Sequence, residues 1–221
     1  MKRSFIKNKI KNKFFAVGIM LVLWWILSKI YPSLIVPKIS DVFFKLREIV
    51  TSKKLSVEIC RTSIRLFMGI FLGIFFGTLA GILCIISKNF REIFKPILGF
   101  FQVIPPVAIL VLSLLWFGFN GKPAILIVCL SVFPTIAICV QDSFLGIDKK
   151  LVEMGKVFNF SKKKMLFLII FPSIKIQFYS GLKIALGIAV KTVVMGEVLT
   201  TSSGIGGQIT TARLNLESET L

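Results

Sequence analysis

The stretch "MGIFLGIFFGTLAG", residues 68–81, places a glycine at every fourth position of an otherwise apolar segment. Residues four apart lie on the same face of a helix, one turn above the other. Gly69, Gly73, Gly77 and Gly81 therefore predict a flat strip where a second helix can approach closely. The pattern favours a partner helix in the same subunit but leaves open one from another subunit.

Apolar segments of this length recur along the whole chain. Of its 221 residues 55% are apolar, and they gather into runs rather than being dispersed. A helix needs about 20 predominantly apolar residues to cross the roughly 30 Å of hydrocarbon in a bilayer. The sequence therefore predicts an all-α integral membrane protein with one transmembrane domain over 1–221, surrounded by lipid. The five expected spans are 14–30, 64–86, 97–117, 124–141 and 179–198.

The net charge of +18 comes mainly from basic residues in three short segments, 2–13, 88–95 and 149–164. Five alternating spans put all three segments on the same side of the membrane. Cytoplasmic loops carry an excess of lysine and arginine. The pattern therefore predicts a cytoplasmic N-terminus over 1–13 and argues against a nucleic-acid partner.

The residue inventory excludes several classes of enzyme. The chain has no histidine, so it holds neither a His-based triad nor an HExxH zinc site. It has no GxxxxGK[ST] motif and therefore does not hydrolyse a nucleotide through a P-loop. Its four cysteines show no metal-ligand spacing. We expect no catalytic residue, no metal site and no cofactor bound by this chain.

The segment "YPSLIVPKISDVFFKLREIVTS", residues 31–52, predicts an amphipathic helix that begins after Ser40. Its apolar residues recur at helical spacing, and its charged residues lie on the other face. Such a helix suits the outer membrane interface. A packed extracytoplasmic loop is an equal alternative.

Two of the predicted spans contain residues that a plain span lacks. Pro105 and Pro106 remove two backbone donors, so the third span must kink or break. Carbonyls freed at membrane depth are tolerated when they are buried in protein or line a wet cavity, so a pathway-facing kink and a packing kink both fit. In the fifth span Lys191 is a candidate for substrate contact. Lys183 and Glu197 lie close enough to its ends to snorkel, and Glu197 is included with Lys191 and both prolines in a candidate pathway.

Between the fourth and fifth predicted spans lies the charged segment "GIDKKLVEMGKVFNFSKKK", residues 146–164. Asp148 is a suitable N-cap for a short amphipathic helix, and Ser161 is suitable for a second one. Asn159 between them belongs to the few residue types that enter the left-handed region at modest cost. Helix, sharp turn and helix together predict a rigid elbow on the cytoplasmic face that docks a partner.

This elbow resembles the cytoplasmic EAA loop of binding-protein-dependent ABC transporter permeases. Glu153, Met154 and Gly155 stand for the E-A-A of the family, and Asn159 for its hinge glycine. Met154 replaces a small residue, and Ile176 stands where the family has a second proline. Four further segments keep the order typical of the nitrate/sulfonate/taurine subgroup: "RLFMG" (65–69), "VIPPVAILVLSLLWFG" (103–118), "GEVL" (196–199) and "GIGGQI" (204–209).

The resemblance implies a type I ABC importer permease fold with a permease core over 57–205 and a coupling loop over 146–164. It implies an ATPase-coupling site at Glu153, Met154, Gly155, Asn159 and Ser161. The implied partners are ABC ATPase subunits that use ATP and Mg²⁺, an extracytoplasmic solute-binding protein and a second permease copy, giving a homodimer in the bacterial inner membrane. The implied substrate is a small anion such as nitrate, a sulfonate or taurine, or a thiamine-precursor-like molecule. Since family members continue into a final span, the resemblance also implies that this chain lacks the last transmembrane helix.

Three alternatives stay open at this point. A secondary transporter or channel would be expected to show inverted repeats or several mid-membrane charges. A membrane enzyme would need clustered polar catalytic groups, and the chain could also be a non-functional truncated fragment. A P-loop ATPase and a secreted binding protein encoded in neighbouring reading frames would favour the importer.

Overall fold

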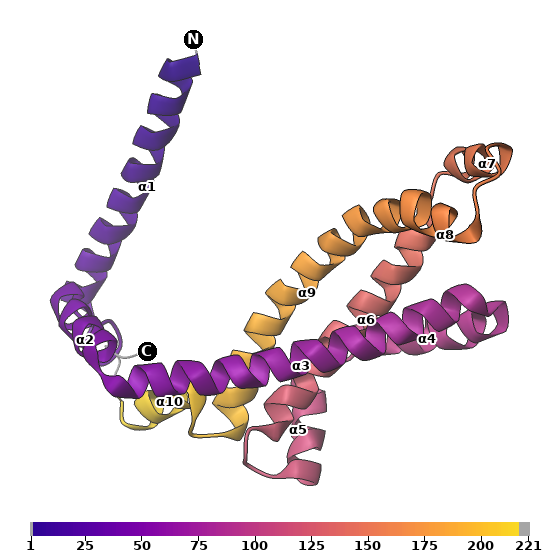
Figure 1. Ribbon diagram of the computed structural model, residues 1–221. Helices are drawn as coiled ribbons and strands as arrows, with labels where there is room; N and C mark the ends of the chain where they lie inside the picture. The colour runs from indigo at the N-terminus through magenta and orange to yellow at the C-terminus, as the bar shows by residue number, and fades with distance from the viewer. Residues whose placement is uncertain (1, 217–221) are drawn as a thin grey trace. The chain divides into compact units, whose positions relative to one another are not determined.

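The computed structural model describes residues 2–216, with side chains from Phe15 onward. These residues form helices joined by short turns and contain no strand, which confirms the all-α prediction (Figure 1). They divide into two compact units. The larger unit is Glu58–Gly207, and the smaller one combines Met1–Val57 with Gln208–Leu221.

The smaller unit contains helices α1 (Lys2–Ile30) and α2 (Ile39–Thr51). The indole Nε1 of Trp24 donates a hydrogen bond to the carbonyl of Pro37 at 3.1 Å, which fixes the turn between the two helices. Helix α2 is amphipathic as predicted but begins at Ile39 rather than after Ser40. It buries none of its residues, so its apolar face is open, as a helix at a membrane interface requires.

The larger unit is organised around α6 (Lys122–Leu145), which packs between α3 (Lys53–Ile86) and α9 (Phe171–Thr200). The glycine strip of α3 lies against α6 of the same chain, the partner that the sequence favoured. A Cβ atom added at Gly73 would lie 2.7 Å from Cβ of Val132, so any larger residue would force the helices apart.

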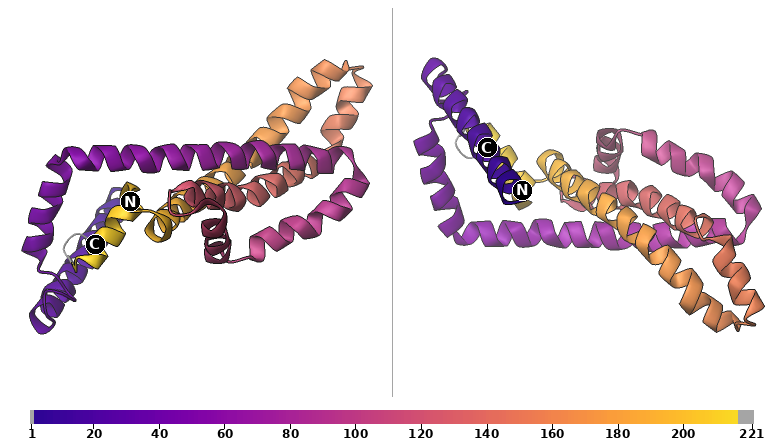
Figure 2. Two further views of the ribbon diagram at one scale, coloured as in Figure 1. Left: turned by 90° about the horizontal axis from the view of Figure 1, so that it is seen from below. Right: turned by 90° about the horizontal axis from the view of Figure 1, so that it is seen from above.

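Helix α6 also packs against small residues of α9, and Figure 2 shows α9 running along α6. Ala185 and Ala189 are buried there, and both belong to the same apolar core as Val132. Glycine and alanine of α3 and α9 thus let the helices approach α6 closely, and the valine and isoleucine side chains of α6 fill the core between them.

The prediction of five spans needs correction. Among the described residues, two helices are long and apolar enough to cross a membrane, α3 and α6. The pair α4 (Lys88–Val103) and α5 (Pro106–Phe117) passes the same test together but is bent by 94°, so it forms a broken span or a re-entrant loop. Among the residues with described side chains, Phe15–Ile30 of α1 forms a shorter apolar helix, and α9 runs antiparallel to α6 along most of its length.

The break between α4 and α5 lies at the two prolines. Pro106 is the first residue of α5, a position where a missing N–H removes no hydrogen bond. Phe94 and Phe101 of α4 both pack edge-on against Phe133 of α6, with ring centroids 6.3 and 6.1 Å apart. These contacts hold α4 against α6, and α5 also packs against α6 but runs at 94° to α4.

Helix α9 is longer than the predicted fifth span, which began at residue 179. The short helix α8 (Lys162–Met165) continues through a π-helical turn, η1 (Leu166–Ile170), directly into α9. Pro172 therefore lies in the first turn of α9, within one continuous helical segment. A π-turn widens the helix just before the proline, whose ring would clash with the carbonyl of the preceding turn in a regular α-helix.

Candidate functional site

The elbow forms the two short helices that the sequence predicted. Helix α7 (Lys149–Val157) begins at Asp148, whose carboxylate accepts a hydrogen bond from the amide of Lys150 at 2.9 Å. Ser161 caps α8 in the same way, accepting from the amide of Lys164. Asn159 between the helices has a φ of 49°, in the left-handed region. Asp148 thus fixes the start of the elbow, and the turn itself is held by the amide of Asn159, which donates to the carbonyl of Lys156, and by the Ser161 cap.

Gly155 gives the elbow its tight internal packing. It is buried, and a Cβ atom at this position would lie 2.8 Å from Cδ1 of Ile169 and 2.9 Å from Sδ of Met165. Its carbonyl accepts a hydrogen bond from the amide of Phe160 at 2.9 Å. The family resemblance assigned Gly155 to contact with a partner. The structure shows that Gly155 also packs α7 against Met165 and Ile169, just before α9 begins.

The outer face of the elbow is apolar and open. Val152 is half-buried and Gly155 is buried on the inner face of α7. We call the four exposed apolar side chains the elbow patch: Leu151, Met154, Val157 and Phe158. Glu153 is also exposed and has no ion pair within the part of the chain that the structure describes.

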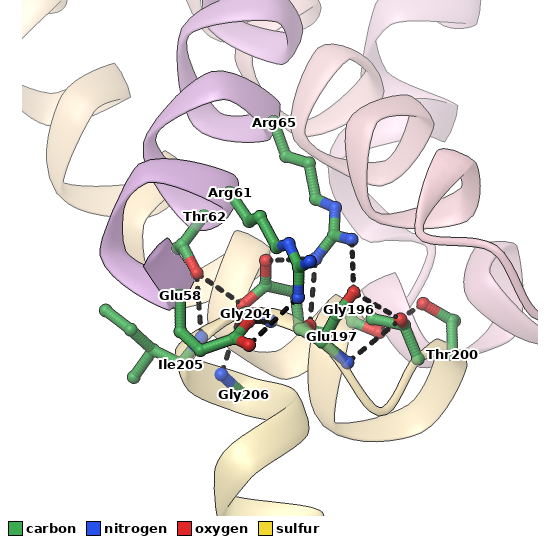
Figure 3. A network of polar contacts seen from close by, with 12 residues as sticks. Glu58, Arg61, Thr62, Arg65, Gly196, Glu197, Thr200, Gly204, Ile205 and Gly206 are labelled. Carbon is green, nitrogen blue, oxygen red and sulfur yellow. Dashed lines mark hydrogen bonds and ion pairs between the residues drawn. The ribbon is translucent and has the colours of Figure 1, made fainter. Parts of the chain in front are cut away.

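A second constellation lies at the other end of α9, and we call it the buried ionic network (Figure 3). The carboxylate of Glu197 is fully enclosed, with 0% exposure. Arg65 of α3 donates to its Oε1 at 2.6 Å, and Thr62 donates to its Oε2 at 2.8 Å. Arg65 also donates to the hydroxyl of Ser203 at 2.7 Å. These contacts join the first half of α3 to the end of α9.

The same network closes the start of α10 (Gly204–Leu214). The first amides of a helix have no partner within it and form its positive end. Here the amide of Gly204 donates to Glu58, that of Ile205 to Thr62 at 2.8 Å, and that of Gly206 to Glu197 at 3.0 Å. In the described residues no buried side-chain nitrogen or oxygen lacks a hydrogen-bond partner.

Two glycines, Gly204 and Gly121, lie so close to the charged groups of Glu197 and Arg65 that a side chain at either position would clash with them. Gly204 has a φ of 88°, and a Cβ atom there would overlap the carboxylate of Glu197. Gly121 has a φ of 79°, and a Cβ atom there would lie 2.6 Å from Nε of Arg65. Gly204 of the "GIGGQI" segment is thus explained by the close approach of its backbone to the buried carboxylate, and Gly207 by its contact with the backbone of Ser202.

The sequence did not identify Glu58, Thr62 or Arg65 as members of a site. One signal was available: Arg65 stands four residues before Gly69, in register with the glycine strip, and therefore on the packing face of α3. A guanidinium on a packing face requires a buried acid as its partner. Glu197 was the acid of the fifth predicted span.

The candidate pathway residues lie in different surroundings. Glu197 does not snorkel, because α3 and α10 enclose it. Lys191 is exposed, and Pro105 and Pro106 are exposed at the break between α4 and α5. Within residues 2–216 no group of three His, Cys, Asp or Glu side chains is placed to hold a metal ion. The structure thus brings the elbow residues together but distributes the pathway candidates over separate elements.

Comparison with known proteins matches this chain to one family. The family described as "Binding-protein-dependent transport system inner membrane component" matches residues 69–220. The chain is 27% identical over 198 residues to "Putative aliphatic sulfonates transport permease protein SsuC" of Bacillus subtilis (strain 168), covering 89% of this chain and 72% of that protein. It is 26% identical to "Taurine transport system permease protein TauC" of Escherichia coli (strain K12), covering 58% of this chain and 46% of that protein.

The fold also resembles a solved structure. A chain in "Inward facing conformations of the MetNI methionine ABC transporter" aligns with 72% of this chain and 81% of its own length, with a TM-score of 0.57. The two sequences are 19% identical, so this likeness concerns the fold alone. It supports the permease fold expected from the sequence.

Proposed function

The chain belongs to the family of binding-protein-dependent transport system inner membrane components, and from this premise we propose that it is the permease subunit of an ATP-driven importer. One observation carries the proposal: the elbow is rigid, and its apolar patch and Glu153 face outward without a partner among the described residues. In this proposal the patch binds a separate ATPase subunit.

The elbow is suited to transmit a displacement because it is rigid and is connected directly to α9. Its turn is held by backbone hydrogen bonds and by the Ser161 cap, Gly155 packs against η1, and η1 continues into α9 without a loop. A push on α7 therefore moves the start of α9. Glu153 anchors the contact by a charge-assisted hydrogen bond, a type worth about 1.5–3 kcal/mol.

The energy for transport comes from the partner in this proposal. The chain has no P-loop motif, so ATP and Mg²⁺ are used by the ATPase subunits. The six lysines of the elbow over 149–164 support a cytoplasmic position for the elbow and the N-terminus.

The pathway in this proposal lies between this chain and a second copy of it, and an extracytoplasmic binding protein delivers the solute. Two relatives are named for aliphatic sulfonates and for taurine. Both names denote small organic sulfonates, and we therefore propose a small anionic solute.

The proposal is tested by co-expressing the chain with the P-loop ATPase encoded beside it and recovering both through a tag on the permease. Glu153→Ala is expected to lower the recovered ATPase by about tenfold or more, since a lost charge-assisted hydrogen bond of this kind corresponds to that change in affinity. Asn159→Val is expected to lower it as well, because a β-branched residue is strained at the left-handed φ of the turn. Membrane insertion should stay unchanged, and Asn159→Gly, which keeps the left-handed turn, serves as the matched control. Recovery of the ATPase at wild-type yield with both variants would contradict the proposal.

A further inference from the structure

We infer that Lys183, Gly187 and Lys191 form a binding site for the anionic group of the transported solute, a sulfonate or carboxylate, on the face of α9 that points away from α6. The inference rests on the proposed function and names the part of the pathway that selects charge. It also extends the sequence prediction, which gave this role to Lys191 alone.

The register of α9 against α6 places these residues level with the middle of α6, a helix long and apolar enough to cross a membrane. Gly181 contacts Cys139 and Gly196 contacts Ala124, so the two helices are antiparallel. This register puts Gly187 level with Phe133, the middle of the candidate span Lys122–Leu145.

The two lysines lie on either side of that level. Each is four residues from Gly187, so each lies about 6 Å above or below it along the helix axis. The sequence placed Lys183 near a helix end, from which it could snorkel. The earlier start of α9 at Phe171 puts it well inside the helix instead.

All three residues lie on one face. Lys183 and Lys191 stand about 40° to either side of Gly187 around the helix axis. The buried residues Ala185 and Ala189 lie on the opposite side, against α6. Both lysines are exposed, and a Cβ atom at Gly187 would meet nothing within 4 Å.

Neither lysine has an acidic partner in the described part of the chain. The carboxylate of Glu197, the one acid of α9, is held by Arg65 and Thr62. A lysine at membrane depth faces protein or a water-filled cavity rather than lipid. Two cations without an acidic partner on one open face suit a water-filled cavity that receives an anion, which is the environment of a solute pathway.

Gly187 has no side chain, so the space between the two lysines is open to a small anion. Lysine ends in a compact cation on a flexible stem, so two side chains one turn above and below Gly187 can converge on one small anionic group. Any side chain at residue 187 would occupy the space between them. Lys175 provides a comparison: it lies level with the end of α6 and over the ring of Tyr179, with 5.8 Å from Nζ to the ring centroid.

A charged thiol reagent tests the site directly. Gly187→Cys introduces a thiol where the backbone has open space, so the fold should accept it. Membranes containing the assembled complex are treated with sulfonatoethyl methanethiosulfonate, an anion, or with its trimethylammonioethyl analogue, a cation. The wild-type chain gives the background from the four native cysteines. Val190→Cys, on the same exposed face, provides a second reporter.

We expect the anionic reagent to react about tenfold faster than the cationic one at residue 187, because each nearby lysine raises the local concentration of anions. Replacing both Lys183 and Lys191 with Gln should bring the ratio close to one, whereas Lys175→Gln should leave it unchanged. The inference is overturned if the ratio of the two rates stays the same after both lysines are replaced. It is also overturned if the thiol at residue 187 reacts with an apolar maleimide but with neither charged reagent. Recovery of the ATPase from the same membranes reports separately on the proposed function.

Discussion

The two ends of α9 are built in opposite ways. At its C-terminal end Glu197 is fully enclosed, and its carboxylate accepts hydrogen bonds from Arg65, Thr62 and the amide of Gly206. At its N-terminal end the elbow is held by two caps and one buried glycine, and its large apolar side chains point outward. One end satisfies all its polar groups within the chain, and the other presents groups for a partner.

This difference indicates how α9 can work as a lever. Its 30 residues extend over about 45 Å. The buried ionic network fixes one end to α3 and to the start of α10, so a force on the elbow can tilt the helix rather than slide it. The face with Lys183 and Lys191 lies between the two ends, where such a tilt would change the pathway.

The largest expected effect comes from breaking the fixed end. Arg65→Ala leaves the carboxylate of Glu197 buried without its cation, which should destabilise the protein by about 3–5 kcal/mol. Thermal unfolding of the purified chain in detergent measures the change. Glu48→Ala removes an exposed pair with Lys45 and should cost at most about 1 kcal/mol. Equal unfolding temperatures for the two variants would contradict the account of the network.

The next effect tests the packing that supports both ends. Gly77→Ala places a Cβ atom 2.7 Å from the carbonyl oxygen of Phe133, and such overpacking should cost about 1–3 kcal/mol. Gly99→Ala makes the same change in α4 where nothing lies within 4 Å, and it should stabilise that helix by up to about 1 kcal/mol. Opposite shifts in unfolding temperature are expected. A stabilised Gly77→Ala would show that the strip does not pack on α6.

A smaller effect is expected at the turn of the elbow. Asn159→Val places a β-branched residue at a φ of 49° and should cost about 1–2 kcal/mol, whereas Asn159→Gly should be neutral or stabilising. Limited proteolysis of the 148–165 segment compares the two variants. Equal cleavage rates would indicate that the turn is not held in the left-handed region.

The smallest effect concerns a single cap. Ser161→Ala removes the hydroxyl that accepts from the amide of Lys164, at a cost of about 0.5–1 kcal/mol. The overall unfolding temperature should barely change, while hydrogen exchange of the first amides of α8 should become faster. Unchanged exchange there would mean that the cap does not hold the elbow.

The sequence predicted local features well because their causes are local. The glycine strip, the caps at Asp148 and Ser161 and the left-handed Asn159 follow from residue type and spacing, and the structure contains each of them. Apolar runs predicted the helices but not the bend of 94° between α4 and α5, where the run contains prolines.

The buried ionic network could not be predicted because its members come from distant segments. Glu58 and Thr62 precede the second predicted span and resemble ordinary polar residues of a helix start. Their role depends on α10 turning back so that its first amides meet them. Charge near a span end suggested snorkelling for Glu197, and tertiary contact with Arg65 overrides that tendency.

The account depends most on the contact between the elbow patch and an ATPase. A photo-activated cross-linking side chain at Met154, which is 44% exposed, tests that contact in intact cells. The account predicts a covalent product with a P-loop ATPase from residue 154 and none from the same probe at Leu46 of α2. An assembled permease that yields no such product at residue 154, or yields it equally at residue 46, would contradict it.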